Sequence, residues 1–538
     1  MKRIDWYKTG LFLFIAAAGS IIYGITAAPT VTFEDSGEFI TAAHILGIAH
    51  PSAYPIYLLI CKIFTFLPFY EIAWRVNIAS SLFVVLSGLI LFDTLINISN
   101  KKTYFISSAL SILLFLSQEI WKQGVIAEVY SLNLLFFALI LRIQLSELPL
   151  LKKIYLNSLA VGLGLCNHLT LVFVVPFLII DIIWRYKKNV FDKMVLLVII
   201  FFIIGISAYL YLPIRSKANP YLDWGNPKSI SEISDVITQK EFSVVRSGGE
   251  LSSFRVKLKY CYNNLNASLP SCFWQVFGIS GILLVFLFKQ IRTGFLLLCL
   301  ILFYTIFVCK MYNVEENILY SINVFFIPAH YSILLATGYG YIRLIERLKD
   351  KGVIMEKILG GFLLIFYGYL FFSKNYETNN KRNYTHAKDW AINVLNCVGD
   401  NGLLLMRIDN DAFPLFYLNK VLKYRTDVEL VNVIFVERLW YRNDLRQRFI
   451  NYDLTEPVDT GNFAVTKRFI FSFVEQAKQE RPVYFLNIPE NISDPWTKEN
   501  FAFLEHSKFS LPHQYIKNLD LFHPCIPEKF DKLDREVI

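Results

Sequence analysis

Charged residues are scarce in this sequence: they make up 18% of its 538 residues, whereas hydrophobic residues make up 55% and aromatic residues 16%. A typical soluble domain has about a quarter charged residues, interleaved with apolar ones. The composition therefore excludes an ordinary soluble enzyme. Because the apolar residues gather into long runs before about residue 372 and thin out afterwards, the sequence predicts a polytopic membrane domain followed by one soluble domain.

Several short motifs are absent as well. The eight cysteines show no CxxC or Cys/His metal spacing, so we expect neither a zinc site nor a disulfide framework. Cys261 and Cys272 are left either as two unpaired thiols or as a disulfide, if their loop faces an oxidising compartment. The C-terminal region has no GxGxxG, P-loop or GxSxG motif, so it shows no sign of a nucleotide site or a serine nucleophile.

The net charge of +9 is not concentrated in one basic face or tail. Lysine and arginine residues stand in small clusters between the apolar runs, which is typical of topology signals at a membrane surface. We therefore expect the lipid bilayer as a partner and no nucleic acid.

Eleven apolar runs are predicted to cross the membrane, since a bilayer core needs about 20 apolar residues per helix. The first run follows a basic N-terminus and has no small-residue cleavage site, so it is predicted to be a retained helix with a cytoplasmic N-terminus. The predicted spans cover residues 9–28, 77–98, 104–118, 125–143, 154–167, 168–184, 192–212, 273–289, 293–311, 318–342 and 353–372.

The short apolar segment Tyr54–Phe69 decides the topology, because counting it as a span reverses the side of every later loop. If it lies along the outer interface, nearly all clustered cations fall in the cytoplasm, as the positive-inside rule requires. We therefore predict a juxtamembrane or re-entrant helix within a membrane domain of residues 1–372. The outer side then holds a first loop of residues 28–76, a second of 213–272, and a C-terminal domain of 373–538.

The C-terminal region 373–538 alternates between strand-like and helix-like patterns, which predicts a small α/β domain with a mainly parallel sheet. After the first predicted strand, Asp409-Asn410-Asp411 either lines a site or holds a cation, or forms a capping turn. The predicted strands are Gly402–Ile408, Val428–Val436 and Pro482–Asn487, and the predicted helices are residues 386–397, 437–450 and 465–479.

Carboxylates are concentrated in the first outer loop. Glu34, Asp35 and Glu38 lie within five residues, and His50-Pro-Ser-Ala-Tyr54-Pro follows. A carboxylate at the bilayer centre costs roughly 2.5–3.5 kcal/mol on insertion scales, so a group of three beside a membrane surface indicates function. Helix capping on a solvated loop explains one of these acids, but it does not explain all three together with the His-Pro segment.

The string EDSGEFITAAHILGIAHPSAYPIY of Glu34–Tyr57 resembles the signature of the protein O-mannosyltransferase family typified by transmembrane protein 260. Similar stretches are WKQGVIAEVY of Trp121–Tyr130, YLPIRSKANPYLDWGNP of Tyr211–Pro227 and RPVYF of Arg481–Phe485. The resemblance implies a GT-C-like multispanning glycosyltransferase that takes a sugar, here expected to be mannose, from a polyprenyl-phosphate carrier. It also implies protein Ser/Thr hydroxyls as acceptors. The expected location is a bacterial inner membrane, with the C-terminal domain in the periplasm.

Transfer of a sugar to a hydroxyl needs a carboxylate that takes the acceptor proton, and a positioned base contributes roughly 10²–10⁴-fold. Negative charge also favours an oxocarbenium-like transition state. We predict Asp35 as the base, with Glu38 as its alternative or orienting partner. Glu128, near the outer end of a predicted span, is either a further catalytic or acceptor-orienting acid or a buried hydrogen-bonded glutamate.

The predicted substrate-binding residues are His50, Tyr54, Arg215 and Arg246. Arg215 is the first choice for the carrier phosphate, because guanidinium groups suit phosphate, although it is equally typical of a side chain that reaches the lipid headgroups. His50 is either a ligand of the sugar, phosphate or Asp35, or a turn-stabilising residue. No cofactor is expected besides the lipid-linked donor, and a divalent cation is not favoured, since one short segment rarely provides enough ligands.

Three other functions remain as alternatives. A polytopic transporter would show matching halves with broken helices, which the sequence lacks. A membrane-anchored interaction protein would tolerate replacement of the first-loop acids. The third alternative is the same chemistry on a lipid or polysaccharide acceptor, which the sequence does not distinguish from a protein acceptor. The sequence also does not identify the sugar, the oligomeric state or the role of the C-terminal domain.

Overall fold

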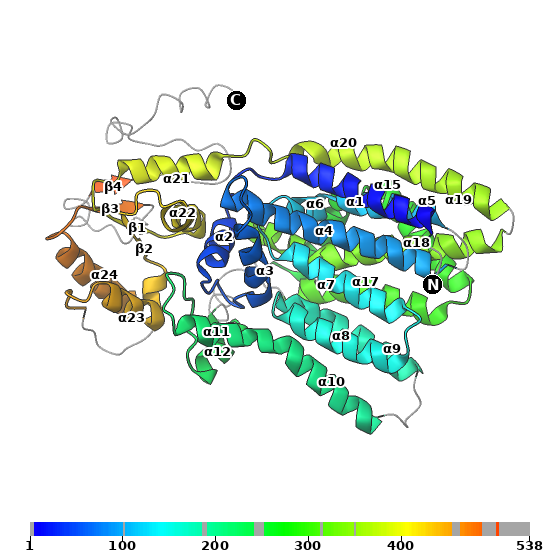
Figure 1. Ribbon diagram of the computed structural model, residues 1–538, viewed down its shortest axis with the longest axis horizontal. Helices are drawn as coiled ribbons and strands as arrows, with labels where there is room; N and C mark the ends of the chain where they lie inside the picture. Colours follow the sequence, from blue (N-terminus) through cyan, green and yellow to red (C-terminus); the bar gives the residue numbers. More distant parts are fainter. Residues whose placement is uncertain are drawn as a thin grey trace.

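The computed structural model describes residues 5–99, 103–185, 191–241, 252–311, 316–348, 351–454, 463–486 and 502–504. Figure 1 shows a helical bundle joined to a smaller α/β domain, with helices α2 (Ser36–Ile45) and α3 (Pro55–Thr65) where the two parts meet. The fold class predicted from the sequence is therefore confirmed.

All eleven predicted spans are largely helical, but they differ in length. Within the described ranges, six helical segments are long and apolar enough to cross a membrane, and a seventh is added if α5 and α6, which bend by 67° at their junction, count as one. The chain is thus an integral membrane protein, as predicted. The six segments are Trp6–Thr26, Ile72–Asn97, Leu196–Ser216, Ile291–Lys310, Leu319–Arg347 and Lys351–Asn379, and the bent pair is Tyr104–Leu116 with Gln118–Gly124.

The other four predicted spans are shorter helices, so the predicted count of eleven needs correction by this criterion. Apolar composition does not distinguish a helix from an apolar turn that precedes it. The run 125–143 shows this, because helix α7 begins only at Tyr130 and the preceding residues form an irregular segment. The shorter helices are α7 (Tyr130–Leu145), α8 (Leu150–Leu165), the segment Leu169–Trp184 and the segment Trp274–Leu287.

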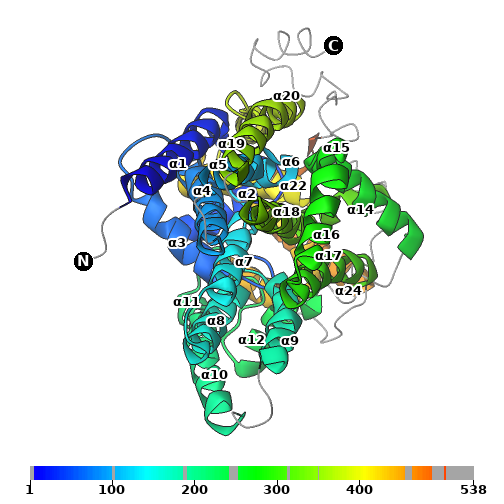
Figure 2. The same cartoon turned by 90° about the vertical axis from the view of Figure 1, so that its right-hand side faces the viewer.

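The bundle has a buried centre and an exposed periphery. Figure 2 looks nearly along its helices, with α4 (Ile72–Asn97), α7 and α18 (Ile327–Arg347) inside. The span of α1 (Trp6–Thr26) and the span containing α10 (Phe191–Ile206) lie at the edge and expose most of their apolar residues. This arrangement suits helices that face lipid.

Helix α3 has 11 residues, too few to cross a bilayer core. One of its faces is buried, and the other exposes Leu59 and Ile63. An exposed apolar face on a short helix is what an interfacial helix requires.

Cys261 and Cys272 do not pair: both thiols are free, and buried Cys261 contacts Cys309 instead.

The C-terminal domain contains a parallel sheet with strand order β2-β1-β3-β4. This confirms the predicted parallel α/β pattern, and each of the three predicted strands contains one observed strand. The strands are β1 (Leu403–Met406), β2 (Glu429–Asn432), β3 (Val483–Leu486) and β4 (Ala502–Leu504), and the helices are α21 (His386–Cys397), α22 (Asp409–Phe416), α23 (Leu439–Arg448) and α24 (Phe463–Ala477).

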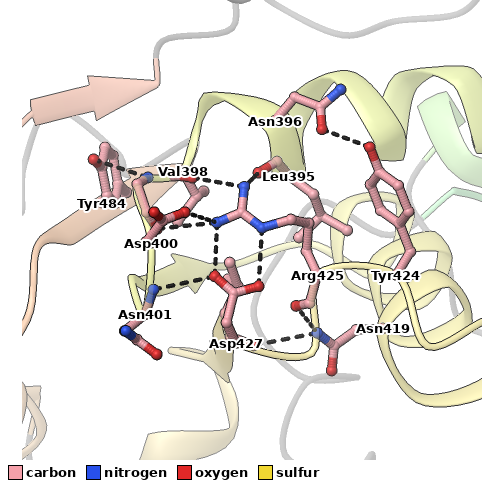
Figure 3. Close-up of polar contacts among 12 residues, drawn as sticks. Leu395, Asn396, Val398, Asp400, Asn401, Asn419, Tyr424, Arg425, Asp427 and Tyr484 are labelled. Carbon is pink, nitrogen blue, oxygen red and sulfur yellow. Dashed lines mark hydrogen bonds and ion pairs between the residues drawn. The ribbon is translucent and has the colours of Figure 1, made fainter.

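One arginine fastens the end of α21 to the turn before β2. Arg425 donates to the carbonyl oxygens of Leu395 and Val398, both at 2.9 Å, and forms two bonds with the carboxylate of Asp427 at 2.9 and 2.8 Å (Figure 3). A cation at a helix C-terminus interacts favourably with the helix dipole. The bonds hold α21 in a fixed position beside the sheet.

The first loop is joined to α22 by close packing. A Cβ atom on Gly37 would lie 2.4 Å from the carbonyl oxygen of Phe413, so only glycine fits between α2 and α22 at this point. The backbone N–H of Glu34 also donates to Oδ1 of Asn410 at 2.8 Å.

The second outer loop is joined to the same domain. The hydroxyl of Tyr221 donates to the carbonyl oxygen of Leu430 at 3.1 Å, and Nε1 of Trp440 donates to Glu241 at 3.0 Å. The three regions that the sequence predicts on one side of the membrane therefore meet in one place.

Candidate functional site

The two predicted catalytic carboxylates lie at the start of α2. Asp35 is the N-cap residue, and Glu38 lies in the first helical turn, where the positive end of the helix dipole favours an anion. Asp35 does not use its side chain as a capping group. It remains 40% exposed, whereas the side chain of Glu38 is completely buried. The two acids thus occupy opposite environments.

His50 holds the buried carboxylate. Its backbone N–H donates to Oε1 of Glu38 at 2.9 Å, and its Nδ1 lies 2.5 Å from Oε2. Burial lowers the pKa of His50, but the charges of Glu38 and Asp35 outweigh that effect and raise the pKa to about 9. His50 is therefore an imidazolium at neutral pH, and its positive charge offsets the cost of burying Glu38.

The other nitrogen of His50 faces the accessible side of the site. Nε2 lies 2.8 Å from the hydroxyl of Tyr54 and 4.0 Å from Oδ2 of Asp35. Asp35 keeps part of its surface exposed, but loss of water around it raises its pKa. The charge of His50 lowers this pKa, whereas the charges of Glu38 and Glu34 raise it, so that the pKa of Asp35 is about 6. Asp35 is therefore mostly ionised at pH 7 and retains appreciable basicity.

Glu128 joins the same group from a different part of the chain. It precedes α7, is 5% exposed, and its Oε2 has no hydrogen-bond partner among the residues that the structure describes. Its charge interacts with those of Asp35 and Glu34 and with the Tyr54 hydroxyl. A buried carboxylate oxygen without a partner is costly. The role of Glu128 as a catalytic or acceptor-orienting acid stays a prediction.

Arg215 lies at the opposite end of α2 from Asp35. Its Nε donates to the carbonyl oxygen of Leu46 at 2.7 Å, and a terminal nitrogen donates to that of Ile45 at 3.3 Å. Ten helical residues separate the two ends, a distance of about 15 Å at 1.5 Å per residue. Arg215 thus caps the C-terminal end of α2, and its role as a ligand of the carrier phosphate stays a prediction.

Two lysines that sequence reasoning did not select lie near the acids. Lys122, on α6, interacts electrostatically with Glu34, Glu119 and Glu128, and Lys381 interacts with Glu34 and Lys122. The sequence contains a signal for the first one, because Lys122 belongs to WKQGVIAEVY and is an isolated cation on the predicted outer side. Arg246, a predicted substrate ligand, lies outside the described residues.

The C-terminal domain contributes a further acid. Asp409 begins α22, directly after the end of β1, and its neighbour Asn410 accepts the bond from Glu34. Although its side chain is solvent-exposed, loss of surrounding water and the charges of Asp35 and Glu38 raise its pKa to about 7, while His50 lowers it. The segment Asp409-Asn410-Asp411 is therefore a first helical turn that lies beside the first loop, and a role in lining the site stays a prediction.

Aromatic rings enclose the first-loop residues. The ring of Tyr54 stacks on that of His168 with centroids 6.0 Å apart, and the ring of His50 lies 6.2 Å from that of Trp224. Within the ranges that the structure describes, no three His, Cys, Asp or Glu side chains form a group suited to a metal ion.

Comparison with known proteins identifies two matching families. Residues 35–191 match the family described as Protein O-mannosyl-transferase TMEM260 N-terminal domain, and residues 387–461 match TMEM260-associated domain 2. The first range begins at Asp35 and contains every other predicted catalytic residue, and the second contains Asp409. The resemblance that the first-loop sequence indicates is confirmed.

Individual proteins agree with this match. Protein O-mannosyl-transferase TMEM260 of Mus musculus is 26% identical over 523 residues, which cover 91% of this chain and 72% of that protein. The Dictyostelium discoideum protein of the same name is 24% identical over 481 residues, 80% of this chain and 58% of its own length. The solved structure of apo ArnT from Cupriavidus metallidurans aligns with a TM-score of 0.54 at 10% identity, over 83% of this chain and 96% of that chain, and thus shares the fold.

Proposed function

We propose, from its similarity to the TMEM260 protein O-mannosyl-transferases, that this chain is a membrane glycosyltransferase. It moves mannose from a polyprenyl-phosphate donor to Ser or Thr hydroxyls of extracytoplasmic proteins. The observation that carries the proposal is the contrast between two neighbouring acids. Glu38 is buried and bonded to His50, whereas Asp35 is accessible, ionised and within 4.0 Å of the same ring.

Asp35 acts as the general base. It takes the proton of the acceptor hydroxyl while the hydroxyl oxygen forms a bond to C1 of the sugar. The bond between C1 and the phosphate oxygen breaks, and the electron pair leaves with the polyprenyl phosphate. Because a neutral hydroxyl is a weak nucleophile, a positioned base contributes roughly 10²–10⁴-fold.

The leaving phosphate needs positive charge more than a proton. His50 supplies a fixed imidazolium, and Lys122 and Lys381 supply ammonium groups near Glu34. Such charge stabilisation at a site shielded from water is often the largest contribution to catalysis. Glu38 serves as a positioning residue, since it holds the His50 ring and keeps it protonated.

The proposed orientation follows the charge distribution. The N-terminus is cytoplasmic, and both large loops and the C-terminal domain lie on the outer side, where the site opens. The bacterial inner membrane stays a prediction, as does the absence of a cofactor besides the donor.

The test uses purified full-length protein with labelled polyprenyl-phosphate mannose and an acceptor protein. Wild type transfers label to Ser or Thr, and Asp35→Asn loses at least about 100-fold of that activity with unchanged thermal stability. Asp235→Asn is the matched control, because Asp235 pairs with Lys240 on the surface, where ion pairs contribute little. Absence of transfer by wild type across several donor sugars contradicts the proposal, and transfer to lipid alone replaces the acceptor class.

A further inference from the structure

The first-loop site adjoins the C-terminal domain. Helices α2 and α22 pack so closely at Gly37 that a Cβ atom there would strike the backbone of Phe413. The bond from Glu34 to Asn410 then fixes the beginning of α22 beside the beginning of α2. Figure 1 shows α22 next to α2, on the side away from the bundle. Asp35 and Asp409 are thus the first acidic groups of two helices that meet.

The position of Asp409 in its own domain is one where ligands bind. It follows β1, an inner strand of a parallel sheet. Side chains beyond the carboxyl ends of strands line the ligand crevices of open α/β sheets. Asp409 lies at this edge of the sheet, and its own side chain is exposed.

A second observation indicates that a ligand enters here. Oε2 of Glu128 is buried without a hydrogen-bond partner in the described part of the chain, and the Glu128 charge interacts with that of Asp35. The charge of Asp409 interacts with that of Asp35 as well, so acids from three distant parts of the sequence converge on the first loop. Polar groups that converge from separate elements are typical of a substrate site.

The charges at this point are compatible with a neutral ligand that carries a hydroxyl. Besides loss of surrounding water, the charges of Asp35, Glu38 and Asp411 raise the pKa of Asp409, and the charge of His50 lowers it. Two carboxyl groups that repel each other do not both ionise readily, and Asp409, the weaker acid of the two, retains a proton for part of the time at neutral pH. A partly protonated carboxyl is able to donate or accept a hydrogen bond.

We propose that the exposed face at the beginnings of α2 and α22 is the acceptor subsite, in which Asp409 hydrogen-bonds the hydroxyl-bearing acceptor residue and holds its hydroxyl against Asp35. The C-terminal domain is then part of the catalytic site. This inference rests on the proposed function, in which the donor occupies the side of Asp35 that faces His50. Asp409 takes no part in bond breaking, so its contribution concerns the acceptor alone.

The test measures transfer with donor and acceptor concentrations varied separately. Asp409→Asn lowers kcat/KM for the acceptor by at least 10-fold and leaves the donor KM within twofold of wild type. Asp400→Asn is the matched control in the same domain, because the Asp400 side chain is fully exposed. Asp409→Glu, which keeps the carboxyl group, recovers part of the acceptor kinetics and serves if the asparagine variant does not fold.

Three outcomes decide the matter. Acceptor kinetics of Asp409→Asn within twofold of wild type overturn the subsite while the proposed function stands. A parallel loss for donor and acceptor with a lower melting temperature also overturns it, because Asp409 then only supports the fold. No transfer by wild type rejects the proposed function itself.

Discussion

Nδ1 of His50 lies 2.5 Å from Oε2 of Glu38, and this carboxylate has no contact with solvent. The contact with Glu38 fixes both the position and the positive charge of the imidazole ring within the loop. Its consequences are accessible to experiment through pH.

Transfer activity is expected to have a bell-shaped dependence on pH. The base Asp35 must be ionised, so activity rises as pH passes through about 6, and His50 must be protonated, so activity falls as pH passes through about 9. The measurement is kcat/KM for the donor from pH 5 to 10. A profile that keeps rising up to pH 10 contradicts the role of the imidazolium.

Glu38→Gln is expected to remove the decrease in stability that wild type shows at alkaline pH. The raised pKa of His50 means that its bond to Glu38 stabilises the fold fully below about pH 6.5 and that this contribution is lost as pH rises through about 9. The variant therefore loses roughly 1–3 kcal/mol at pH 7 and shows a flatter melting temperature between pH 7 and 10. If the melting temperature of the variant falls between pH 7 and 10 as steeply as that of wild type, the pair of His50 and Glu38 is not ionised.

Replacement of Lys122 and replacement of Arg215 should have different effects on the kinetics. Lys122→Gln raises the donor KM by at least about 10-fold, as expected for loss of a charge-assisted bond to phosphate. Arg215→Gln lowers the melting temperature, because it leaves the carbonyl groups of Ile45 and Leu46 without their donor, and changes the donor KM less. If Arg215→Gln raises the donor KM more than Lys122→Gln does, Arg215 and not Lys122 binds the donor phosphate.

Gly37→Ala is expected to disrupt the joint between α2 and α22. The new methyl group lies 2.4 Å from the Phe413 carbonyl oxygen, and overpacking of this kind costs roughly 1–3 kcal/mol. The C-terminal domain should become more sensitive to proteolysis, and transfer should fall. Gly361→Ala is the control, because a Cβ atom there meets nothing within 4 Å. Equal behaviour of the two variants means that the joint tolerates the methyl group.

A reporter that is active only outside the cytoplasm tests the orientation. Fused after Asn379, at the end of α20 (Gly368–Asn379), it is expected to be active. Fused after Arg347, at the end of α18, it is expected to be silent, since the following basic cluster is predicted to be cytoplasmic. The opposite pattern means that the segment containing α3 crosses the membrane.

Local patterns in the sequence predicted much of this structure. The helix predicted for residues 386–397 matches α21, and the strand predicted for Val428–Val436 contains β2. Helix periodicity and short apolar runs depend on neighbouring residues, so one sequence contains them. The acids Asp35 and Glu38 were predicted on the same grounds, as local charge beside a membrane span.

Contacts between distant residues were not predictable in this way. The bond from Glu34 to Asn410 joins positions 376 residues apart, and no local pattern relates them. Arg215 follows a span at the right depth, but the sequence does not show which end of α2 it contacts. Span counts were affected by a different cause, because the apolar run before Tyr130 contains a non-helical segment that holds Glu128.

The packing of α22 against α2 also fixes an order of assembly during synthesis. Domains generally fold as units from the N-terminus while the chain is still being made. The first loop, with Asp35 and His50, is therefore inserted at the membrane long before Asp409 has been translated. His50 and Lys122 on the donor side are in place first, and the protein acquires Lys381 and its acceptor side only when the last domain is translated.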